Sequence, residues 1–245
     1  MNDSSAAGAS GTLYLVPTPI GNLEDITGRA RRILEAVYVV ACEDSRVTGR
    51  LLSHLAIHAR LISYHDYNER RQSASLLAFL KSGKDVAVVT DAGSPGISDP
   101  AYRIICAAIE ASIRIVPLPG PTSIIPALTA SGLPLDRFFF EGFAPKTAAS
   151  RQKRFKELEP FRHTLVFLES PQRVLSTLRD AAAILGGRRA CIARELSKLH
   201  EEFIRGTLPE LIEALDGKKI RGEIVLIIAG KEKVKRVKVN KYKPD

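Results

Sequence analysis

Three loops rich in glycine and proline follow predicted strands in the first half of the chain. They are "PTPIGNLEDIT" (17–27), "DAGSPGIS" (91–98) and "PLPGPTSIIPA" (117–127). Proline fixes φ and removes a backbone donor, while glycine permits positive φ, so such loops can press their backbone against a bound molecule. Ligands bind beyond the carboxyl ends of the strands in open α/β sheets. We therefore predict that these loops form a small-molecule site.

Each loop also has a purely structural interpretation. In the first loop, Asp25 is placed to cap the following helix. In the second, Pro95-Gly96 fits the middle of a type II turn, and Asp99-Pro100 fits a helix N-cap followed by proline at N1. In the third, Thr122 fits a cap, although the same helix start would also suit a ligand carboxylate. Capping accounts for Asp99-Pro100 but leaves "DAGSPGIS" unexplained, which favours a binding role for that segment.

Apolar runs alternate with amphipathic helices and would position these loops. The strand-like runs of the first half are 12–17, 37–42, 60–64, 85–91 and 113–119. The predicted helices between them are 26–37, 45–55, 69–83 and 100–112. Continuous Val/Ile/Leu strands that alternate with helices predict a parallel sheet covered on both faces.

The second half differs in character, which predicts a second α/β domain. A helix at 121–132 leads into a Pro/aromatic stretch at 133–145 and then a basic helix. Further strands are predicted at 163–170, 188–195, 201–207 and 222–230, with helices at 171–187 and 208–216. The expected organisation is a flexible leader (1–11), an N-terminal α/β domain (12–122), a C-terminal α/β domain (123–232) and a basic tail (233–245).

Composition narrows the class of protein. The 245 residues are 45% hydrophobic and carry a net charge of +9, with basic clusters at 29–32 and 151–156 and in the tail. Such a surface suits a polyanion such as RNA, and it equally suits an ordinary solvated surface. Three separated cysteines indicate a reducing cytoplasm, and no histidine spacing indicates a bound metal. No apolar run has the length of a membrane span, and the first residues do not read as a signal peptide.

Nine segments together resemble the tetrapyrrole methylase-like (class III) S-adenosylmethionine-dependent methyltransferases, and within them those that methylate bacterial ribosomal RNA. They are "LYLVPTPIGNLEDIT" (13–27), "ACEDSRVTGRLL" (41–52), "YHDYNE" (64–69), "DAGSPGISDP" (91–100), "VPLPGPTSIIPALTASGLP" (116–134), "FFFEGFAP" (138–145), "TLVFLESPQR" (164–173), "ARELSKLHEEFIRG" (193–206) and "GEIVLIIAG" (222–230).

The resemblance implies two α/β domains of the tetrapyrrole methylase type, with a parallel sheet in the N-terminal domain and a mixed sheet in the C-terminal domain. It also implies a homodimer that binds S-adenosylmethionine in the cleft between the domains of each chain. It implies 2′-O-methylation of a cytidine in the decoding region of 16S ribosomal RNA, free or in the 30S subunit. Relatives that methylate tetrapyrroles have Gly-Asp-Pro where this chain has "GSP" (93–95), so Ser94 replaces an acid. The cofactor contacts implied by the matched motifs are Ile20, Ser94, Ile97, Thr122, Ser123, Leu168 and Ala193.

Methyl transfer to a ribose hydroxyl would gain from a positioned base, because that hydroxyl is a weak acid. The candidate catalytic residues are the carboxylates Glu43, Asp44 and Asp91; Glu69 and Glu169 are further acids in matched motifs. Any of these would equally serve as a helix cap or in a surface ion pair. The predicted RNA contacts are Arg46, His65, Asn68, Arg151, Lys153 and Arg154.

Two other functions remain open on the residues alone. One is methylation of a tetrapyrrole or another small acceptor, against which the basic clusters and the "GSP" segment count. The other is a non-catalytic RNA-binding protein that retains an old cofactor fold. Binding of the cofactor would separate this second alternative from an enzyme.

Overall fold

The computed structural model describes residues 10–232, and these residues form two compact units. The first unit contains the chain up to Pro126 together with Glu195–Glu201, and the second contains Ala127–Arg194 and the chain from Glu202 onward. The predicted tail (233–245) lies outside the described residues, as does the predicted leader except for Ser10 and Gly11. Among the described residues, no helix is long and apolar enough to cross a membrane.

The first unit is built on a parallel sheet of five strands in the order β3-β2-β4-β1-β5. The strands are β1 (Leu13–Leu15), β2 (Val39–Cys42), β3 (Leu61–Ser63), β4 (Val86–Val88) and β5 (Ile115–Pro117). The helices are η1 (Leu23–Asp25), α1 (Gly28–Ala36), α2 (Ser45–His54), α3 (Glu69–Lys81) and α4 (Tyr102–Glu110). Because all five strands run in the same direction, their carboxyl ends and the loops that follow them share one edge of the sheet.

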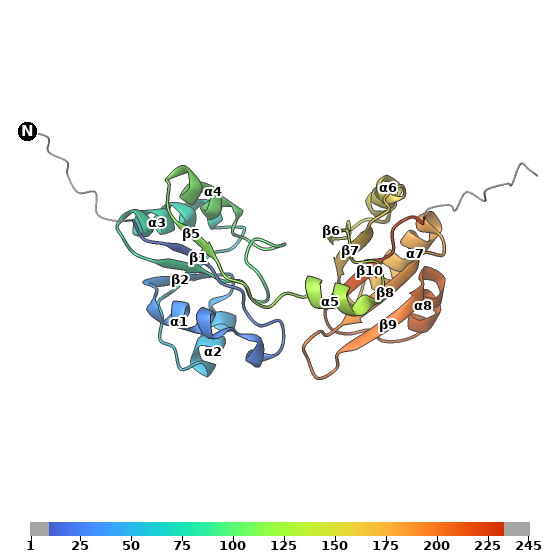
Figure 1. Ribbon diagram of the computed structural model, residues 1–245, viewed down its shortest axis with the longest axis horizontal. Coiled ribbons are helices and arrows are strands. Elements are labelled where there is room, and N and C mark those ends of the chain that lie inside the picture. Colours follow the sequence, from blue (N-terminus) through green and yellow to red (C-terminus); the bar gives the residue numbers. More distant parts are fainter. Residues whose placement is uncertain (1–9, 233–245) are drawn as a thin grey trace, which may run out of the picture. The chain divides into compact units, whose positions relative to one another are not determined.

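Both faces of this sheet are covered by helices, with α1 and α2 on one face and α3 and α4 on the other (Figure 1). Strand β2 shows the alternation that this requires. Val40 and Cys42 pack with the α1–α2 core, whereas Val39 and Ala41 pack with the α3–α4 core. All four are fully buried, which explains why the strand reads as an unbroken apolar run.

The second unit contains a mixed sheet in the order β6-β7-β10-β8-β9. Its strands are β6 (Phe138–Phe143), β7 (Thr164–Glu169), β8 (Arg189–Arg194), β9 (Glu202–Thr207) and β10 (Ile224–Ile228). Strands β6 and β7 are parallel and the other pairs are antiparallel. The helices are α5 (Ile124–Ser131), which begins in the first unit, α6 (Ala148–Leu158), α7 (Val174–Leu185) and α8 (Leu208–Leu215).

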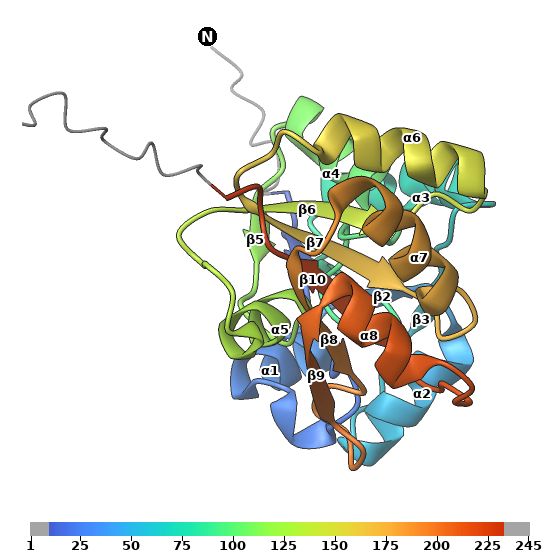
Figure 2. The same cartoon turned by 90° about the vertical axis from the view of Figure 1, so that its right-hand side faces the viewer.

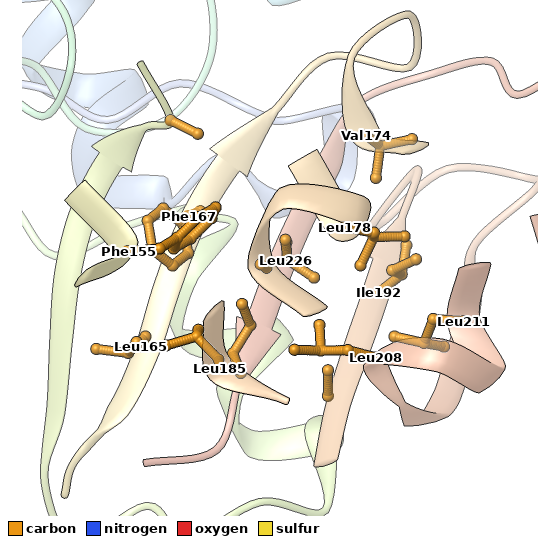
Figure 3. Packing of buried hydrophobic residues seen from close by; sticks show 14 of the residues in the cluster. Phe155, Leu165, Phe167, Val174, Leu178, Leu185, Ile192, Leu208, Leu211 and Leu226 are labelled. Carbon is orange, nitrogen blue, oxygen red and sulfur yellow. The ribbon is translucent and has the colours of Figure 1, made fainter. Parts of the chain in front are cut away.

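Helices α6, α7 and α8 lie together on one face of this sheet (Figure 2). Their apolar side chains form a core with alternate residues of the strands (Figure 3). Phe155 of α6 packs edge-on against Phe167 of β7, with ring centroids 5.6 Å apart. Because side chains alternate along a strand, Leu168, the next residue of β7, points to the opposite face of the sheet.

The structure confirms the predicted fold class of two α/β domains, one with a parallel and one with a mixed sheet. Strand β6 was not predicted, because proline and three consecutive phenylalanines hide any alternation. The division at Pro126 lies four residues beyond the expected boundary at 122/123, and nothing in the sequence indicated that 195–201 belongs to the first unit.

Two predicted helix caps are wrong. Helix α4 begins at Tyr102 with Ala101 at its N-cap, so Asp99-Pro100 lies outside the helix. Helix α1 is capped by Thr27, whose hydroxyl accepts from the N–H of Ala30 at 3.0 Å, and not by Asp25. The predicted type II turn at Pro95-Gly96 is confirmed, because Gly96 has a φ of +85° and the Ile97 N–H donates to the Ser94 carbonyl.

We expect Gly120→Ala to destabilise the protein by about 1–3 kcal/mol, because an added methyl group would overpack a rigid contact. A Cβ at this position would lie 2.8 Å from Cβ of Pro17, which joins the first and third loops. Gly187→Ala is the matched control, since a Cβ there meets no atom within 4 Å. Urea unfolding of both variants tests this expectation, and equal midpoints would contradict it.

Candidate functional site

The loops that follow β1 and β4 are joined by a short antiparallel bridge. The N–H of Thr18 donates to the carbonyl of Gly93, and the N–H of Gly93 donates to the carbonyl of Thr18, each at 2.9 Å. The Thr18 hydroxyl also donates to the Thr90 carbonyl at 2.9 Å. Gly93 has a φ of +81°, which favours glycine. The bridge therefore fixes the two loops as one unit at the carboxyl edge of the sheet.

The predicted cofactor contacts of the first unit lie on these joined loops and on the loop after β5. A Cβ on Gly93 would lie 3.7 Å from Cγ2 of Ile20, so the two residues approach closely. Ser94 Oγ donates to the carbonyl of Pro121 at 3.5 Å, immediately before Thr122 and Ser123. Ile97 leaves 46% of its surface exposed, which is high for an isoleucine in a rigid turn.

This set of side chains fits the parts of S-adenosylmethionine. Ile20 and Ile97 offer apolar surface for the adenosine, and Ser94 offers a hydroxyl. Thr122 accepts from the Ile124 N–H at 3.3 Å at the start of α5, where the helix dipole favours a carboxylate. The residues present thus match an apolar ring system and an anionic end group.

Leu168 and Ala193, the remaining predicted cofactor contacts, lie in the second unit on strands that flank β10. Both pair with Val225, so the three residues form a row across the sheet on the face away from α6–α8. Their spacing of 25 residues in the sequence gave no sign of this proximity.

Asp44 and Asp91 come together at the ends of β2 and β4. The N–H of Asp44 donates to Oδ1 of Asp91 at 3.1 Å. Asp44 itself caps α2 by accepting from the Arg46 N–H at 2.8 Å, and it pairs with the Arg46 guanidinium at 2.6 Å. Hydrogen bonds from Arg46 lower the pKa of Asp44 to about 2. This makes Asp44 a poor base and a good anchor for Arg46.

Glu43, the neighbour of Asp44, has the opposite electrostatic environment. Burial raises the pKa of Glu43, and the negative charges of Asp91 and Asp66 raise it further. A carboxylate with a raised pKa accepts a proton more readily at neutral pH. Among the three predicted catalytic residues, Glu43 is therefore the one whose surroundings suit a base.

Asp99 belongs to the same group of carboxylates, although the sequence interpretation assigned it to a cap. Burial raises the pKa of Asp99 to about 6, with further contributions from Glu43, Asp91 and Asp66. Its position after a glycine turn and before a proline was the available signal, but capping explained that signal equally well. Among the described residues, no group of His, Cys, Asp and Glu side chains has an arrangement that would hold a metal ion.

The predicted RNA contacts His65 and Asn68 form a tight turn after β3. Asn68 accepts from the His65 N–H at 3.0 Å and donates to the Ser63 carbonyl at 3.1 Å. Its Nδ2 also lies 3.1 Å from Nε2 of His65. Glu69, at the start of α3, forms an ion pair with Arg103. Asn68 thus orders the turn, whereas Tyr67 between them is 99% exposed.

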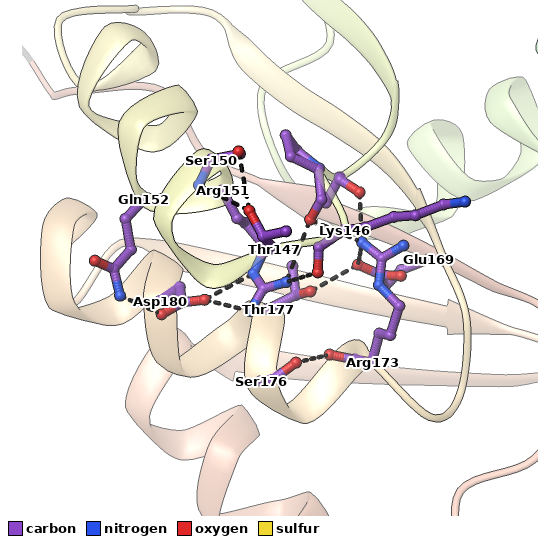
Figure 4. A network of polar contacts seen from close by, with 12 residues as sticks. Lys146, Thr147, Ser150, Arg151, Gln152, Glu169, Arg173, Ser176, Thr177 and Asp180 are labelled. Carbon is purple, nitrogen blue, oxygen red and sulfur yellow. Dashed lines mark hydrogen bonds and ion pairs between the residues drawn. The ribbon is translucent and has the colours of Figure 1, made fainter.

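Three of the four arginine and lysine residues of the basic helix α6 are predicted RNA contacts, and their surroundings differ. Arg151 is 4% exposed, pairs with Asp180 and donates to the carbonyls of Pro145 and Lys146 (Figure 4). This burial is at odds with the predicted RNA contact of Arg151, because its guanidinium already has internal partners. Arg154 pairs with both Glu141 and Glu157. Lys153 is exposed, and it keeps the predicted role most readily.

Glu169 is likewise a buried structural residue. Its side chain is 0% exposed and accepts from the Thr177 hydroxyl at 2.6 Å (Figure 4). It also accepts from the Ser170 N–H at 2.8 Å. It also pairs with Arg173, which donates to the carbonyls of Ala144 and Pro145. Arg173 and Arg151 therefore hold the loop between β6 and α6 from two sides, and Glu169 orients one of them.

Residues 195–201 contact the first loop within the first unit. Ser197 Oγ forms a hydrogen bond with the Asp25 carboxylate, and the aliphatic stem of Lys198 lies against Gly21. A side chain at position 21 would overlap that stem, with a Cβ only 2.3 Å from Cγ of Lys198. No motif in the sequence pointed to these contacts, because the partners are about 170 residues apart.

Comparison with known proteins places this architecture in a family. A model of the family described as Tetrapyrrole (Corrin/Porphyrin) Methylases matches residues 12–212. The chain is 49% identical over 222 residues to a ribosomal RNA small subunit methyltransferase I of Micromonospora olivasterospora, covering 90% of this chain and 71% of that protein. It is 47% identical over 229 residues to a protein of the same name from Escherichia coli O157:H7, covering 92% and 80%.

A third similar protein of that name, from Thermotoga maritima, is 44% identical over 222 residues and matches over its whole length and 91% of this chain. Among solved structures, the uroporphyrin-III-C-methyltransferase from Thermus thermophilus is similar, with a TM-score of 0.62 and 25% identity. The match covers 89% of this chain and 94% of that one.

Asp99→Asn is expected to stabilise the protein at pH 7–8. The pKa of Asp99 is raised to about 6 in the folded protein, from about 4 in the unfolded chain. Ionisation of Asp99 therefore opposes folding fully above pH 6, and it has no effect well below pH 4, where the group is protonated in both states. We expect a gain of about 1–2 kcal/mol at pH 8 that vanishes as the pH falls from 6 to 4. Urea unfolding at pH 8, 6 and 4 measures it, with exposed Asp136→Asn as control; a gain that persists at pH 4 would count against burial as the cause.

Arg151→Ala is expected to lower the stability of the protein, whereas Lys153→Ala is expected to weaken its binding to RNA. The first leaves the Asp180 carboxylate without its buried partner and should cost about 3–5 kcal/mol of stability. The second should leave the unfolding midpoint unchanged and weaken RNA binding, with a smaller salt dependence. Urea unfolding and fluorescence anisotropy with an RNA oligonucleotide at two salt concentrations separate the two effects. An Arg151→Ala protein of unaltered stability would refute the structural role.

Proposed function

This chain belongs to the tetrapyrrole methylase family, and on that premise we propose that it methylates a ribose 2′-hydroxyl of 16S ribosomal RNA with S-adenosylmethionine as the donor. The acceptor is a cytidine of the decoding region. The observation that carries the proposal is the identity of 41–49% over most of the chain with proteins named ribosomal RNA small subunit methyltransferase I. The enzyme acts in the cytoplasm as a homodimer.

Features of the site support an RNA acceptor over a tetrapyrrole. Ser94 stands where the tetrapyrrole-methylating relatives place an acid, and it is bonded to the loop after β5. Exposed basic side chains, among them Arg46 and Lys153, are available to phosphates. Arg46 is held in place through Asp44, so its position is defined before the substrate arrives.

Three loops of the first unit hold the cofactor in this proposal. Ile20 and Ile97 would contact the adenosine, and Thr122 and Ser123 would bind the carboxylate at the start of α5. The Ser94 hydroxyl donates to the Pro121 carbonyl, so it would accept a hydrogen bond from the cofactor. When bound, S-adenosylmethionine supplies an electrophilic methyl group on a sulfonium. Leu168 and Ala193 of the second unit stay predicted contacts.

The residues of this chain then act on the acceptor. The rigid loops would hold the acceptor hydroxyl beside the bound cofactor, and such placement contributes much of the rate of a two-substrate reaction. Glu43 accepts the proton of the hydroxyl, for which its raised pKa is suited. Asp44 positions Arg46, and Asp91 fixes the Asp44 backbone at the edge of the site.

The test of this function is incubation with S-adenosylmethionine carrying a tritiated methyl group. The acceptors are 30S subunits, naked 16S ribosomal RNA and uroporphyrinogen, each in a separate reaction. Label in the RNA of either form supports the proposal, and label in the porphyrinogen alone overturns it. Calorimetry that detects no cofactor binding would favour an RNA-binding protein without catalysis.

Glu43→Gln is expected to lower the single-turnover rate of methyl transfer by about 10²–10⁴-fold, because a positioned base is lost. Cofactor affinity, measured by calorimetry, should stay close to that of the unaltered protein. The wild-type rate should fall as the pH decreases through the raised pKa of Glu43, and the variant should lose this dependence. Asp44→Asn keeps the helix cap and should cost less; an equal loss would transfer the role of base to Asp44.

A further inference from the structure

A cavity of about 320 Å³ opens in the first unit beside the proposed cofactor loops. It lies between the loop after β1, helix α2 and the end of β4. This volume is at the small end of the range of about 300–1,000 Å³ found for ligand pockets. None of the residues predicted to bind the cofactor lines this cavity, so the proposed cofactor site does not account for it.

The walls of this cavity are largely apolar. Pro19 and Leu23 contribute from the loop, and Val47 and Leu51 contribute from α2. Two of the hydroxyls that line the cavity already have acceptors. The Thr18 hydroxyl donates to the Thr90 carbonyl, and the Thr90 hydroxyl donates to the Gly93 carbonyl. Apolar walls suit the faces of a ring, and any polar recognition must come from the few polar groups that remain.

Thr48 is one of those groups. It is 2% exposed and lines the cavity, and its Oγ1 has no nitrogen or oxygen partner among the described residues. The Cys42 thiol lies close enough for Thr48 to lower its pKa against the larger effect of burial, but sulfur is only a weak hydrogen-bond partner. The nearby Cys42 thiol donates to the carbonyl of Ile62 at 3.6 Å. A buried hydroxyl without a strong partner costs free energy unless a ligand satisfies it. The position of Thr48 therefore points to a polar atom of a bound molecule.

Asp91 is the second group. Its Oδ1 accepts from the Asp44 N–H at 3.1 Å, which fixes the carboxylate, and the side chain lines the cavity. An ionised carboxylate accepts hydrogen bonds but cannot donate them, so the ligand group that meets Asp91 in the cavity must be a donor. Carboxylates recognise the exocyclic amino group of cytosine in this way, whereas uracil presents an acceptor at the same position.

Arg50 lines the same cavity from an exposed position on α2. Its location suits a phosphate that adjoins a bound nucleoside. An apolar slot, a buried hydroxyl, a fixed carboxylate and an exposed guanidinium together match a nucleotide whose base has left its stack.

We propose that this cavity receives the extruded base of the target nucleotide, with Asp91 accepting from its amino group, Thr48 satisfying a second polar atom and Arg50 binding the adjacent phosphate. This rests on the proposed function, because it assumes an RNA acceptor. Holding the base fixes the attached ribose beside the cofactor loops. Asp91 is thereby assigned to recognition of the substrate and not to proton transfer.

The first test fills the cavity. Leu51→Trp should lower kcat/KM for methylation of 30S subunits at least about tenfold, while the cofactor affinity measured by calorimetry stays unchanged. Ser53→Trp adds the same ring to an exposed position of the same helix and is the control. Wild-type transfer by Leu51→Trp would overturn the proposal.

Thr48→Val provides a second test of the cavity in case Leu51→Trp perturbs folding. Replacing an unsatisfied hydroxyl by a methyl group of similar shape should leave stability unchanged or raised. Transfer to 30S subunits should nevertheless fall about 5–10-fold, since a neutral hydrogen bond to the substrate is lost. A stable Thr48→Val protein with unaltered transfer would also overturn the proposal.

The last test concerns the identity of the base. The nucleotide labelled by the wild-type enzyme is mapped, and 30S subunits are reconstituted with uridine there. The wild type should prefer the original cytidine about 10–100-fold in kcat/KM, and Asp91→Asn should reduce or reverse that preference. If Asp91→Asn keeps the wild-type preference for cytidine over uridine, Asp91 does not recognise the base. Failure of the wild type to label 16S ribosomal RNA, either naked or in 30S subunits, overturns the proposed function itself, whereas normal labelling by every variant overturns only the cavity.

Discussion

Two backbone hydrogen bonds between Thr18 and Gly93 hold together the loops on which the site depends. Parallel strands bring their carboxyl ends to one edge but do not by themselves fix the loops beyond that edge. The bridge does so without any side chain, which is possible because Gly93 adopts a positive φ. The turn at Pro95-Gly96 and the contact of Gly120 with Pro17 then extend the same rigid surface to the third loop.

Electrostatics divides the carboxylates of this edge into different roles. Glu43 and Asp44 are adjacent in the chain, yet the pKa of the first is raised and that of the second is lowered to about 2. Asp44 is exposed enough to meet the Arg46 guanidinium and caps a helix, whereas Glu43 is partly buried near Asp91. One dipeptide can therefore supply a proton acceptor and the anchor of a cation, because its two side chains enter different surroundings.

Basic residues show the same dependence on surroundings. The cluster at 151–156 reads as one positive patch in the sequence, but its arginines are neutralised by acids from other elements. Arg151 pairs with Asp180 of α7, 29 residues away, and serves to hold the loop between β6 and α6. Net charge thus overstated the cationic surface of α6, and Lys153 is the cluster residue predicted for RNA contact that stays open to a phosphate.

Local sequence by itself determined the alternation of strands and helices, the two α/β domains and the loops at the strand ends, because periodicity and the dihedral limits of glycine and proline act over a few residues. The nine segments also sufficed to identify the family. Contacts between distant residues were decided only by the tertiary structure: the bridge from Thr18 to Gly93, the docking of 195–201, and the cavity around Thr48. Hydrogen-bond partners and pKa shifts depend on which groups the fold brings within a few ångströms, and spacing along the chain does not encode that proximity.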